Sequence, residues 1–242
     1  MRRGSAVGGS GPSIPRDLQA DHREFARSVA PWLERLPLGL QTLQLLTRFG
    51  LLVREQADRL AVISKNDRTA IFTRHVLDSL NPVALFASPP RTALDLGSGA
   101  GFPGIPLAIV WPSTKWIVVE SREKKAGFLE KAVRELGLKN VEVVCARIED
   151  LASARGEASR EEPIESVFVR ALGDLPKLFS SVSSLAADGA RWVYFMGAGG
   201  DPGSLASELG PYGSEARVEK GAFGGLLFHG ALGANVPRGT FS

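Results

Sequence analysis

The stretch DLGSGAGFPG, Asp95 to Gly104, decides the fold of this chain of 242 residues. Four of its ten residues are glycines, and it follows the apolar run Thr92 to Leu94. Glycines between a strand and a helix let a ligand contact backbone N–H groups where a Cβ atom would block it, and the N-terminus of the helix favours electron-rich groups. The stretch therefore predicts a strand, then a ligand-binding loop, then a helix that begins near Gly104.

Two ligand-binding spacings overlap in this stretch. Gly99, Gly101 and Gly104 form the G-x-G-x-x-G spacing that is typical of NAD and FAD sites. Residues 95–101 form the D-x-G-x-G-x-G spacing of class I S-adenosylmethionine methyltransferases. Asp95 favours the methyltransferase, since dinucleotide folds usually have an apolar residue there, and a carboxylate can fix the loop N–H groups or meet the cationic end of S-adenosylmethionine. A nicotinamide-dependent oxidoreductase is the alternative.

Acidic residues further along the chain also fit a nucleotide ligand. Glu120 ends the apolar stretch KWIVVE, 21 positions after Gly99, where an acid hydrogen-bonds ribose hydroxyls in nucleotide-binding α/β folds. Both candidate cofactors predict this acid. In CARIEDL, which follows the next apolar stretch, Ile148 is expected to cover one face of an adenine, with Glu149 or Asp150 near its exocyclic amine.

The two parts of the chain on either side of residue 88 have different patterns. Residues 1–15 are rich in Gly, Ser and Pro and are expected to be disordered. Residues 16–88 carry apolar residues at helical spacing, interrupted by Pro31 and Pro37, which predicts a small helical cap. Residues 89–242 alternate short apolar runs with helical patterns, which predicts an α/β, Rossmann-like domain with a doubly wound, mostly parallel sheet. Helices are expected at 122–136 and 175–187, and two closing strands near 217–219 and 226–229.

The composition is that of a globular protein with a mild basic bias. The net charge of +3 permits an anionic partner without requiring one. Cys145 is the single cysteine, so an internal disulfide and a cysteine-based zinc cluster are excluded, and a reducing cytosol fits. Its apolar neighbours predict a buried strand thiol. Apolar runs are too short to span a membrane and no signal peptide is visible, so we expect a cytoplasmic protein with no membrane partner.

Several segments of the chain together resemble one family. They are RHVLDSL (74–80), LDLGSGAGFPGIPLAIVWP (94–112), EKKAGFL (123–129), LGLKNVEVV with ARIED (136–150) and VRAL (169–172). GAGFPGIPLAI is specific, because general methyltransferase loops do not continue with this run of two prolines. Over roughly residues 65–197 the chain resembles the small-subunit ribosomal RNA methyltransferase G family, also called glucose-inhibited division protein B.

The resemblance implies a class I enzyme that uses S-adenosylmethionine to methylate N7 of a guanine in 16S ribosomal RNA, as free RNA or in the small ribosomal subunit. We expect the protein to be a monomer. Guanine N7 has a lone pair and no proton, so we expect no catalytic base and no metal, and the enzyme contributes positioning. The cofactor-binding set expected from the loop, the acids and the resemblance is Asp95, Gly97, Ser98, Gly99, Gly101, Phe102, Glu120, Ile148, Glu149 and Arg170.

The target base must be unpaired, because the deep major groove of A-form RNA hides N7 from side chains. The RNA must be held through its phosphates. The expected RNA-binding residues are Arg74, His75, Lys124, Lys125, Arg147 and Arg170. His75 has an equally weighted alternative, because Arg74, His75, Asp78 and Ser79 share a helical spacing that also suits a purely structural polar cluster.

The chain departs from the family pattern at four places. Glu120 stands where the family usually has Asp, which preserves the ribose contact. RLAVISK (59–65) replaces an Asn-Leu-Thr stretch, and the segment after Gly197 is unusually rich in glycine. Met196 stands where the family has Lys, which removes a charge expected to face RNA. These departures leave three alternatives open: a changed substrate, a small-molecule methyltransferase, and a ribosome-binding protein without turnover.

Overall fold

The computed structural model describes most of the chain between residues 38 and 232. The described residues are 19–20, 23, 25, 27, 38–60, 71–155, 162–170, 173, 175–197, 200–209, 213–221 and 225–232. The predicted disorder of residues 1–15 and most of the RLAVISK segment lie outside them. No helix within these ranges is both long enough and apolar enough to cross a membrane.

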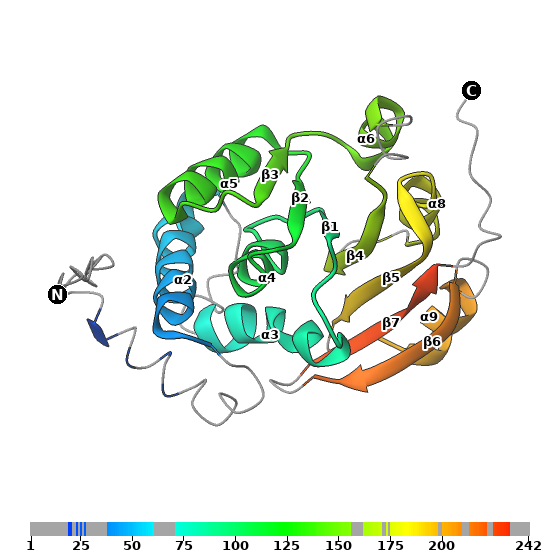
Figure 1. Cartoon of the computed structure of the whole chain (residues 1–242), viewed down its shortest axis with the longest axis horizontal. Helices are drawn as coiled ribbons and strands as arrows, with labels where there is room; N and C mark the ends of the chain where they lie inside the picture. Colours follow the sequence, from blue (N-terminus) through cyan, green and yellow to red (C-terminus); the bar gives the residue numbers. More distant parts are fainter. Residues whose placement is uncertain are drawn as a thin grey trace, which may run out of the picture.

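A seven-stranded sheet forms the centre of the molecule (Figure 1). Its order is β3-β2-β1-β4-β5-β7-β6. The first five strands are parallel, and β7 runs antiparallel to both β5 and β6. The strands are β1 (Thr92–Leu96), β2 (Lys115–Val119), β3 (Val141–Val144), β4 (Ile164–Arg170), β5 (Ala186–Met196), β6 (Gly213–Lys220) and β7 (Leu226–Leu232). The predicted doubly wound, mostly parallel sheet and its two closing strands are confirmed.

Helices cover both faces of this sheet. They are α2 (Leu40–Leu60), α3 (Leu77–Ser79), α4 (Gly104–Val110), α5 (Glu123–Leu136), α6 (Ile148–Arg155), α8 (Leu175–Ser183) and α9 (Pro202–Leu209). A π-helical turn, η4 (Ile71–Val76), precedes α3, and a 3-10 helix, η5 (Asn81–Leu85), follows it. Figure 1 shows α2, α4 and α5 gathered on one side and α6 and α8 on the other.

The burial of β1 explains why the sequence around it is so apolar. β1 lies between β2 and β4, so both of its faces are covered and it is buried along nearly its whole length. Leu94 packs in the core beneath α6 and α8, whereas Ala93 packs on the opposite side against α4. Because side chains alternate along a strand, Asp95 points to the same side as Ala93, toward the beginning of α4.

The N-terminal helical segment shares a hydrophobic core with the sheet domain. Phe49 of α2 lies in one buried cluster with Phe102 of the glycine loop and Leu129 of α5. α2 approaches η4 closely, since a Cβ added to Gly50 would collide with the Phe72 ring. The helical cap is therefore continuous in its packing with the glycine loop, and its boundary at residue 88 stays a prediction.

Three sequence-based expectations need correction. The helix predicted for 175–187 ends at Ser183, because the chain enters β5 at Ala186 and pairs there with Ile164 of β4. Cys145 is exposed and not buried, because the edge strand β3 ends one residue before it. Met196 is only 8% exposed and packs in the core beneath α8 and α9, so this position does not present a side chain to RNA.

Candidate cofactor and nucleic-acid site

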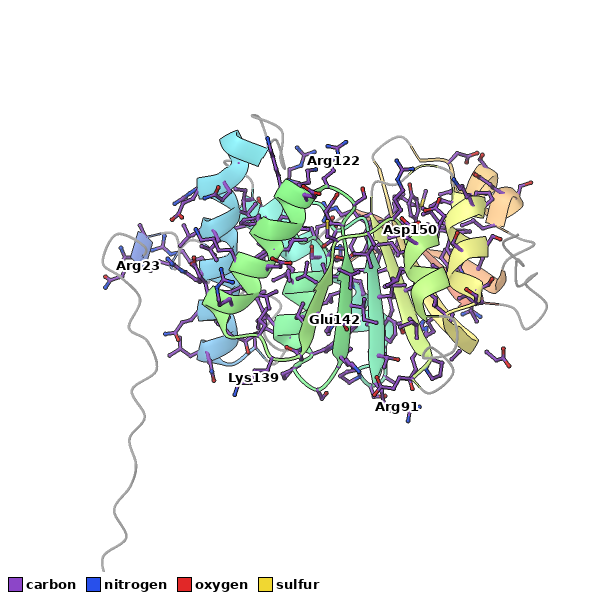
Figure 2. The ribbon with its side chains drawn as sticks, turned by 90° about the horizontal axis from the view of Figure 1, so that it is seen from above. Arg23, Arg91, Arg122, Lys139, Glu142 and Asp150 are labelled. Atoms are coloured by element: carbon purple, nitrogen blue, oxygen red, sulfur yellow. The ribbon has the colours of Figure 1, made fainter. Side chains whose placement is uncertain are left out.

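The strand order places the site at the carboxyl edge of the sheet between β1 and β4. β2 and β3 extend from one side of β1, and β4 and β5 extend from the other. Ligands of open α/β sheets bind outside the carboxyl ends of the strands at such a switch point. Figure 2 shows the two edges: Arg122 and Asp150 follow β2 and β3 at the upper end, and Arg91 and Lys139 precede β1 and β3 at the lower end.

The glycine loop takes a path that only glycine adopts without strain. Gly97, Gly99 and Gly101 have φ angles of 63°, 61° and 96°, all in the left-handed region. The Gly101 and Phe102 N–H groups both donate to the Ser98 carbonyl, at 2.8 and 3.1 Å. A Cβ on Gly101 would lie 2.9 Å from Phe49 Cζ, so the back of the loop is closed by α2.

Asp95 holds the loop to the beginning of α4. It is completely buried, and its Oδ2 accepts hydrogen bonds from the Gly104 N–H at 3.0 Å and from Ser98 Oγ at 2.5 Å. Its Oδ1 is buried with no hydrogen-bond partner among the described residues. Burial raises the pKa of Asp95 to about 6, although the bonds from Ser98 and Gly104 act in the opposite direction. Of its two predicted roles, the geometry supports fixing the loop.

Ser98 also acts inside the loop. Its N–H donates to the Val119 carbonyl at 3.0 Å and its hydroxyl donates to Asp95. The side chain is almost fully buried. Both donors of Ser98 are therefore engaged within the protein, so its expected contribution to a cofactor is structural.

Glu120 faces the glycine loop from the end of β2. Its Oε2 accepts a hydrogen bond from the Gly99 N–H at 2.9 Å, and its Oε1 accepts one from the Arg122 N–H at 2.8 Å. The side chain is 6% exposed. An ionised carboxylate has about four acceptor sites, so two bonds leave capacity for a further donor. The sequence did not indicate this contact with the loop, and the predicted contact of Glu120 with ribose hydroxyls stays a prediction.

Ile148 and Glu149 begin α6 at the next strand end. Ile148 is 7% exposed and contributes to the core on the α6 and α8 side. Glu149 Oε1 pairs with Lys177 Nζ of α8 at 3.0 Å. The Glu149 backbone N–H and then Lys177 lower the pKa of its carboxyl. Lys177 was missed in the sequence, because nothing in a periodic helix pattern marks a contact to another helix.

Arg170, the last residue of β4, is held by the segment that begins with Arg74. Its guanidinium pairs with Asp78 Oδ2 at 3.1 Å and donates to His75 Nδ1 and to the Arg74 carbonyl, both at 3.3 Å. Burial raises the pKa of Asp78, although the Arg170 charge acts in the opposite direction. The polar cluster predicted from the spacing of residues 74–79 is present. Arg170, from the distant strand β4, lies at its centre.

Phe102 joins this cluster to the core. Its ring lies 5.2 Å from the Phe49 ring and 5.3 Å from the His75 ring, the latter nearly parallel, and it is 6% exposed. The side chain is thus part of the packing beneath the loop. Any contact of Phe102 with a cofactor would come from its backbone.

Basic side chains predicted to bind RNA lie along the same edge. Lys124 and Lys125 are in the first turn of α5, which follows β2, and Arg147 is in the connection from β3 to α6. Lys124, Arg147 and Arg74 are exposed, and Lys125 is partly buried. They therefore surround the loop from several of the connections that meet at the carboxyl ends of the parallel strands.

Comparison with known proteins identifies the family. Residues 42–200 match the model of the GidB family, described as rRNA small subunit methyltransferase G, and these residues make up more than half of the chain. The chain belongs to the rRNA small subunit methyltransferase G family. The matched residues include the glycine loop, Glu120, the RIED segment and Arg170.

Relatives in the rRNA small subunit methyltransferase G family cover much of the chain. The protein of this name from Acidiphilium cryptum is 37% identical over 158 residues, 64% of this chain and 69% of the relative. That from Cereibacter sphaeroides is 36% identical over 171 residues, 69% and 79% of the two chains. That from Chlorobium phaeobacteroides is 30% identical over 192 residues, 78% and 80% of the two chains.

Solved structures agree with the fold. A SAM-dependent methyltransferase from Aquifex aeolicus superposes with a TM-score of 0.51 at 16% identity, covering 72% of this chain and 97% of that one. A tRNA (m1A58) methyltransferase, TrmI, from Aquifex aeolicus gives a TM-score of 0.50 at 16% identity and covers 64% and 67% of the chains. Together with the family, this fold makes the protein an S-adenosylmethionine-dependent methyltransferase, and the nicotinamide-dependent alternative is wrong.

Proposed function

We propose that this methyltransferase transfers a methyl group from S-adenosylmethionine to N7 of an unpaired guanine in 16S ribosomal RNA, acting as a monomer. The observation that carries the proposal is the coincidence of two features. The family match over residues 42–200 contains the whole carboxyl edge of β1 to β4, and that edge combines a glycine loop, a facing acid and a row of basic side chains.

The residues at this edge fit the cofactor. A Cβ added to Gly99 would meet nothing nearer than the Gly97 carbonyl at 3.8 Å, so the loop is open on the side away from α2 and its backbone can be approached. Gly97 is also partly exposed. We assign Gly97 and Gly99 to backbone contacts with the methionine part and Glu120 to the ribose hydroxyls, while Gly101 and Phe102, whose N–H groups donate to the Ser98 carbonyl, hold the shape of the loop.

The adenine would lie over α6. Ile148, which is 7% exposed, would contribute only the edge of its side chain to the adenine face, and Glu149 is an acceptor for the exocyclic amine. Glu149 is 33% exposed at its side chain, so it can exchange part of its interaction with Lys177 for a ligand donor. Asp95 and Ser98 support the loop from beneath, as their shared hydrogen bond shows.

The chemistry demands little of the side chains beyond positioning. When bound, S-adenosylmethionine supplies an electrophilic methyl group, and guanine N7 attacks it with a lone pair that carries no proton. No general base is needed, so the chain contributes orientation and the exclusion of water. Arg170, which lies at the switch point between β1 and β4, contributes a fixed positive charge to the same site.

The RNA would be held by charge along the carboxyl edge. Lys124, Lys125 and Arg147 lie around the loop, and Arg74 adds a further basic side chain from η4. Each phosphate neutralised by such a side chain releases counterions, so binding should weaken steeply with salt. The target guanine must be unstacked to expose N7, as in loops and bulges of RNA.

Transfer of radiolabelled methyl to 30S subunits from cells that lack the suspected activity tests the proposal. We expect one labelled guanine, mapped by cleavage specific for N7-methylguanine. Substitution Glu149→Ala should strongly reduce the label, whereas Asp188→Asn, an exposed position near the amino end of β5, serves as the matched control. Binding of S-adenosylmethionine without any incorporation into 30S subunits would refute the ribosomal target.

A further inference from the structure

We propose that Asp78 is the positioning residue for Arg170: its carboxylate, itself fixed by Asn81, orients the Arg170 guanidinium beside the glycine loop before any ligand binds. The inference rests on the proposed function, in which Arg170 contributes to the site. It assigns a role within that site to Asp78, a residue that makes no contact with cofactor or RNA in the proposal.

Arg170 lies at a position where the direction of its guanidinium decides whether it can bind a ligand. It ends β4, whose preceding residues pair with β1, and β1 opens directly into the glycine loop. A guanidinium at this switch point can present N–H donors to an anionic oxygen, either the cofactor carboxylate or an RNA phosphate. Arginine side chains have many rotamers, so a useful direction has to be imposed by neighbours.

The neighbours that impose this direction come from one short segment. Besides Asp78, the Arg74 carbonyl, His75 Nδ1 and Ser79 Oγ accept from Arg170, at 3.3, 3.3 and 3.5 Å. The guanidinium also lies over the Phe195 ring, whose centroid is 5.6 Å from Cζ. Among these partners Asp78 is the one with a negative charge, so it contributes the strongest and most directional contact.

Asp78 is held in place from two sides. Asn81 Nδ2 donates to Asp78 Oδ1 at 2.8 Å, which leaves Oδ2 to face Arg170. Gly221, directly after β6, and Gly225, directly before β7, lie against the same pair. A Cβ on Gly225 would lie 2.6 Å from Asp78 Oδ1, and a Cβ on Gly221 would collide with the Asn81 amide. The absence of side chains at these two glycines lets their backbone approach Asp78 and Asn81 closely, which limits the space into which Asp78 could move.

The ion pair also bears on the glycine loop through His75. Because Arg170 donates to His75 Nδ1, that nitrogen must be an acceptor, and the neutral ring then carries its proton on Nε2. The same ring stacks on Phe102 of the loop at 5.3 Å. Asp78 and Arg170 are 20% exposed or less, so the pair is shielded from water and its loss is not compensated by solvent.

A double-mutant cycle tests whether Asp78 acts through Arg170. We expect Asp78→Asn to lower kcat/KM for 30S methylation about 10–100-fold, the scale of a small misplacement of a reacting or binding group. In an Arg170→Ala background the same change should have almost no further effect, because the group that it orients is gone. Effects that multiply in the double variant would overturn the proposal, since a residue that merely stabilises the fold acts independently.

Binding measurements show which anionic oxygen Arg170 serves. A weakened Kd for S-adenosylhomocysteine in Asp78→Asn would indicate the cofactor carboxylate, and a raised KM for 30S subunits with unchanged Kd would indicate an RNA phosphate. Asp78→Asn behaving as wild type in both measurements overturns the proposal. Asp188→Asn is the matched control for the substitution itself.

Two further comparisons keep the test decisive. If Asp78→Asn does not fold, Asn81→Ala keeps both charges and removes the bond that fixes Asp78, so it should shift the same parameter in the same direction by a smaller factor. A normal value in that variant would overturn the proposal. If the wild-type protein does not methylate 30S subunits, the proposed function fails, and the cycle is then decided by Kd for S-adenosylhomocysteine alone.

Discussion

The buried carboxyl group of Asp95 makes the stability of the protein depend on pH in a direction unusual for an aspartate. Its pKa rises from the ordinary 3.8 to about 6 because the side chain has no access to water. Between these values the native protein holds a proton that the unfolded chain has released. The free energy of unfolding therefore falls by about 2 kcal/mol for this group as the pH rises from about 4 to about 6.

The substitution Asp95→Asn isolates this contribution. The asparagine Oδ1 can still accept from the Gly104 N–H and from Ser98 Oγ, and its amide does not titrate in this range. The amide N–H₂ takes the place of the partnerless Oδ1, and whatever this costs is the same at every pH. The difference in stability between variant and wild type should therefore change by about 2.5 kcal/mol between about pH 4 and about pH 7.5, in favour of the variant at the higher pH.

Urea unfolding at a series of pH values measures this difference. All other titrating groups are common to both proteins and cancel in the comparison, so a single step centred between the two pKa values of Asp95 should remain. A stability difference that stays constant across the range would show that burial does not raise the pKa of Asp95. A variant that gains stability relative to wild type as the pH falls would show that the pKa of Asp95 is lowered by its hydrogen bonds.

Other substitutions at the carboxyl edge have equally definite outcomes. Gly101→Ala places a side chain at a φ of 96° and within 2.9 Å of Phe49, so chemical unfolding should show a loss of about 2–4 kcal/mol, and a loss below about 0.5 kcal/mol would contradict this packing. Glu120→Gln removes the charge while keeping the shape, so calorimetry should show an affinity for S-adenosylhomocysteine about tenfold lower, and an unchanged affinity would remove Glu120 from the site. Lys124→Ala combined with Arg147→Ala should reduce the slope of log K for 30S binding against log salt by about 1 for each phosphate that the variant no longer neutralises, and an unchanged slope would place the RNA elsewhere.

Local sequence signals predicted the strand, the loop and the helix around Asp95 correctly. They depend on patterns that act within a few residues, such as the glycine spacing and the burial of a parallel strand on both faces. The order of the elements along the chain and the helices on both faces follow from the same alternation. The hydrogen bond from the Gly99 N–H to Glu120 was not expected, because the two residues are 21 positions apart and only the pairing of β1 with β2 brings them together.

Interactions between distant segments could not be predicted in the same way. Arg170 and Asp78 come together only because the fold brings the end of β4 beside α3, and no periodicity encodes that distance. The packing of the Phe102 ring between Phe49 and His75 was not predicted either, and the cofactor contact expected of this residue stays a prediction for its backbone. Local apolarity around Cys145 suggested burial, but β3 is an edge strand and the chain has already left the sheet there.

Met196 illustrates how a departure from a family pattern depends on where the fold places it. Taken alone, an apolar residue in place of lysine indicated weaker binding to RNA. In the structure its side chain packs with the core beneath α8 and α9, where an apolar side chain is the stable choice. The departure therefore gives no reason to expect a protein without turnover.

A crystal structure of the chain with S-adenosylhomocysteine is the most direct test of where the cofactor binds. The expected complex has the ribose hydroxyls within hydrogen-bond distance of Glu120, the adenine against Ile148 and the amino-acid part over Gly97 and Gly99. Arg170 should keep its ion pair with Asp78. Ligand density at the opposite edge of the sheet, or on the loop with Glu120 making no contact to it, would contradict the site.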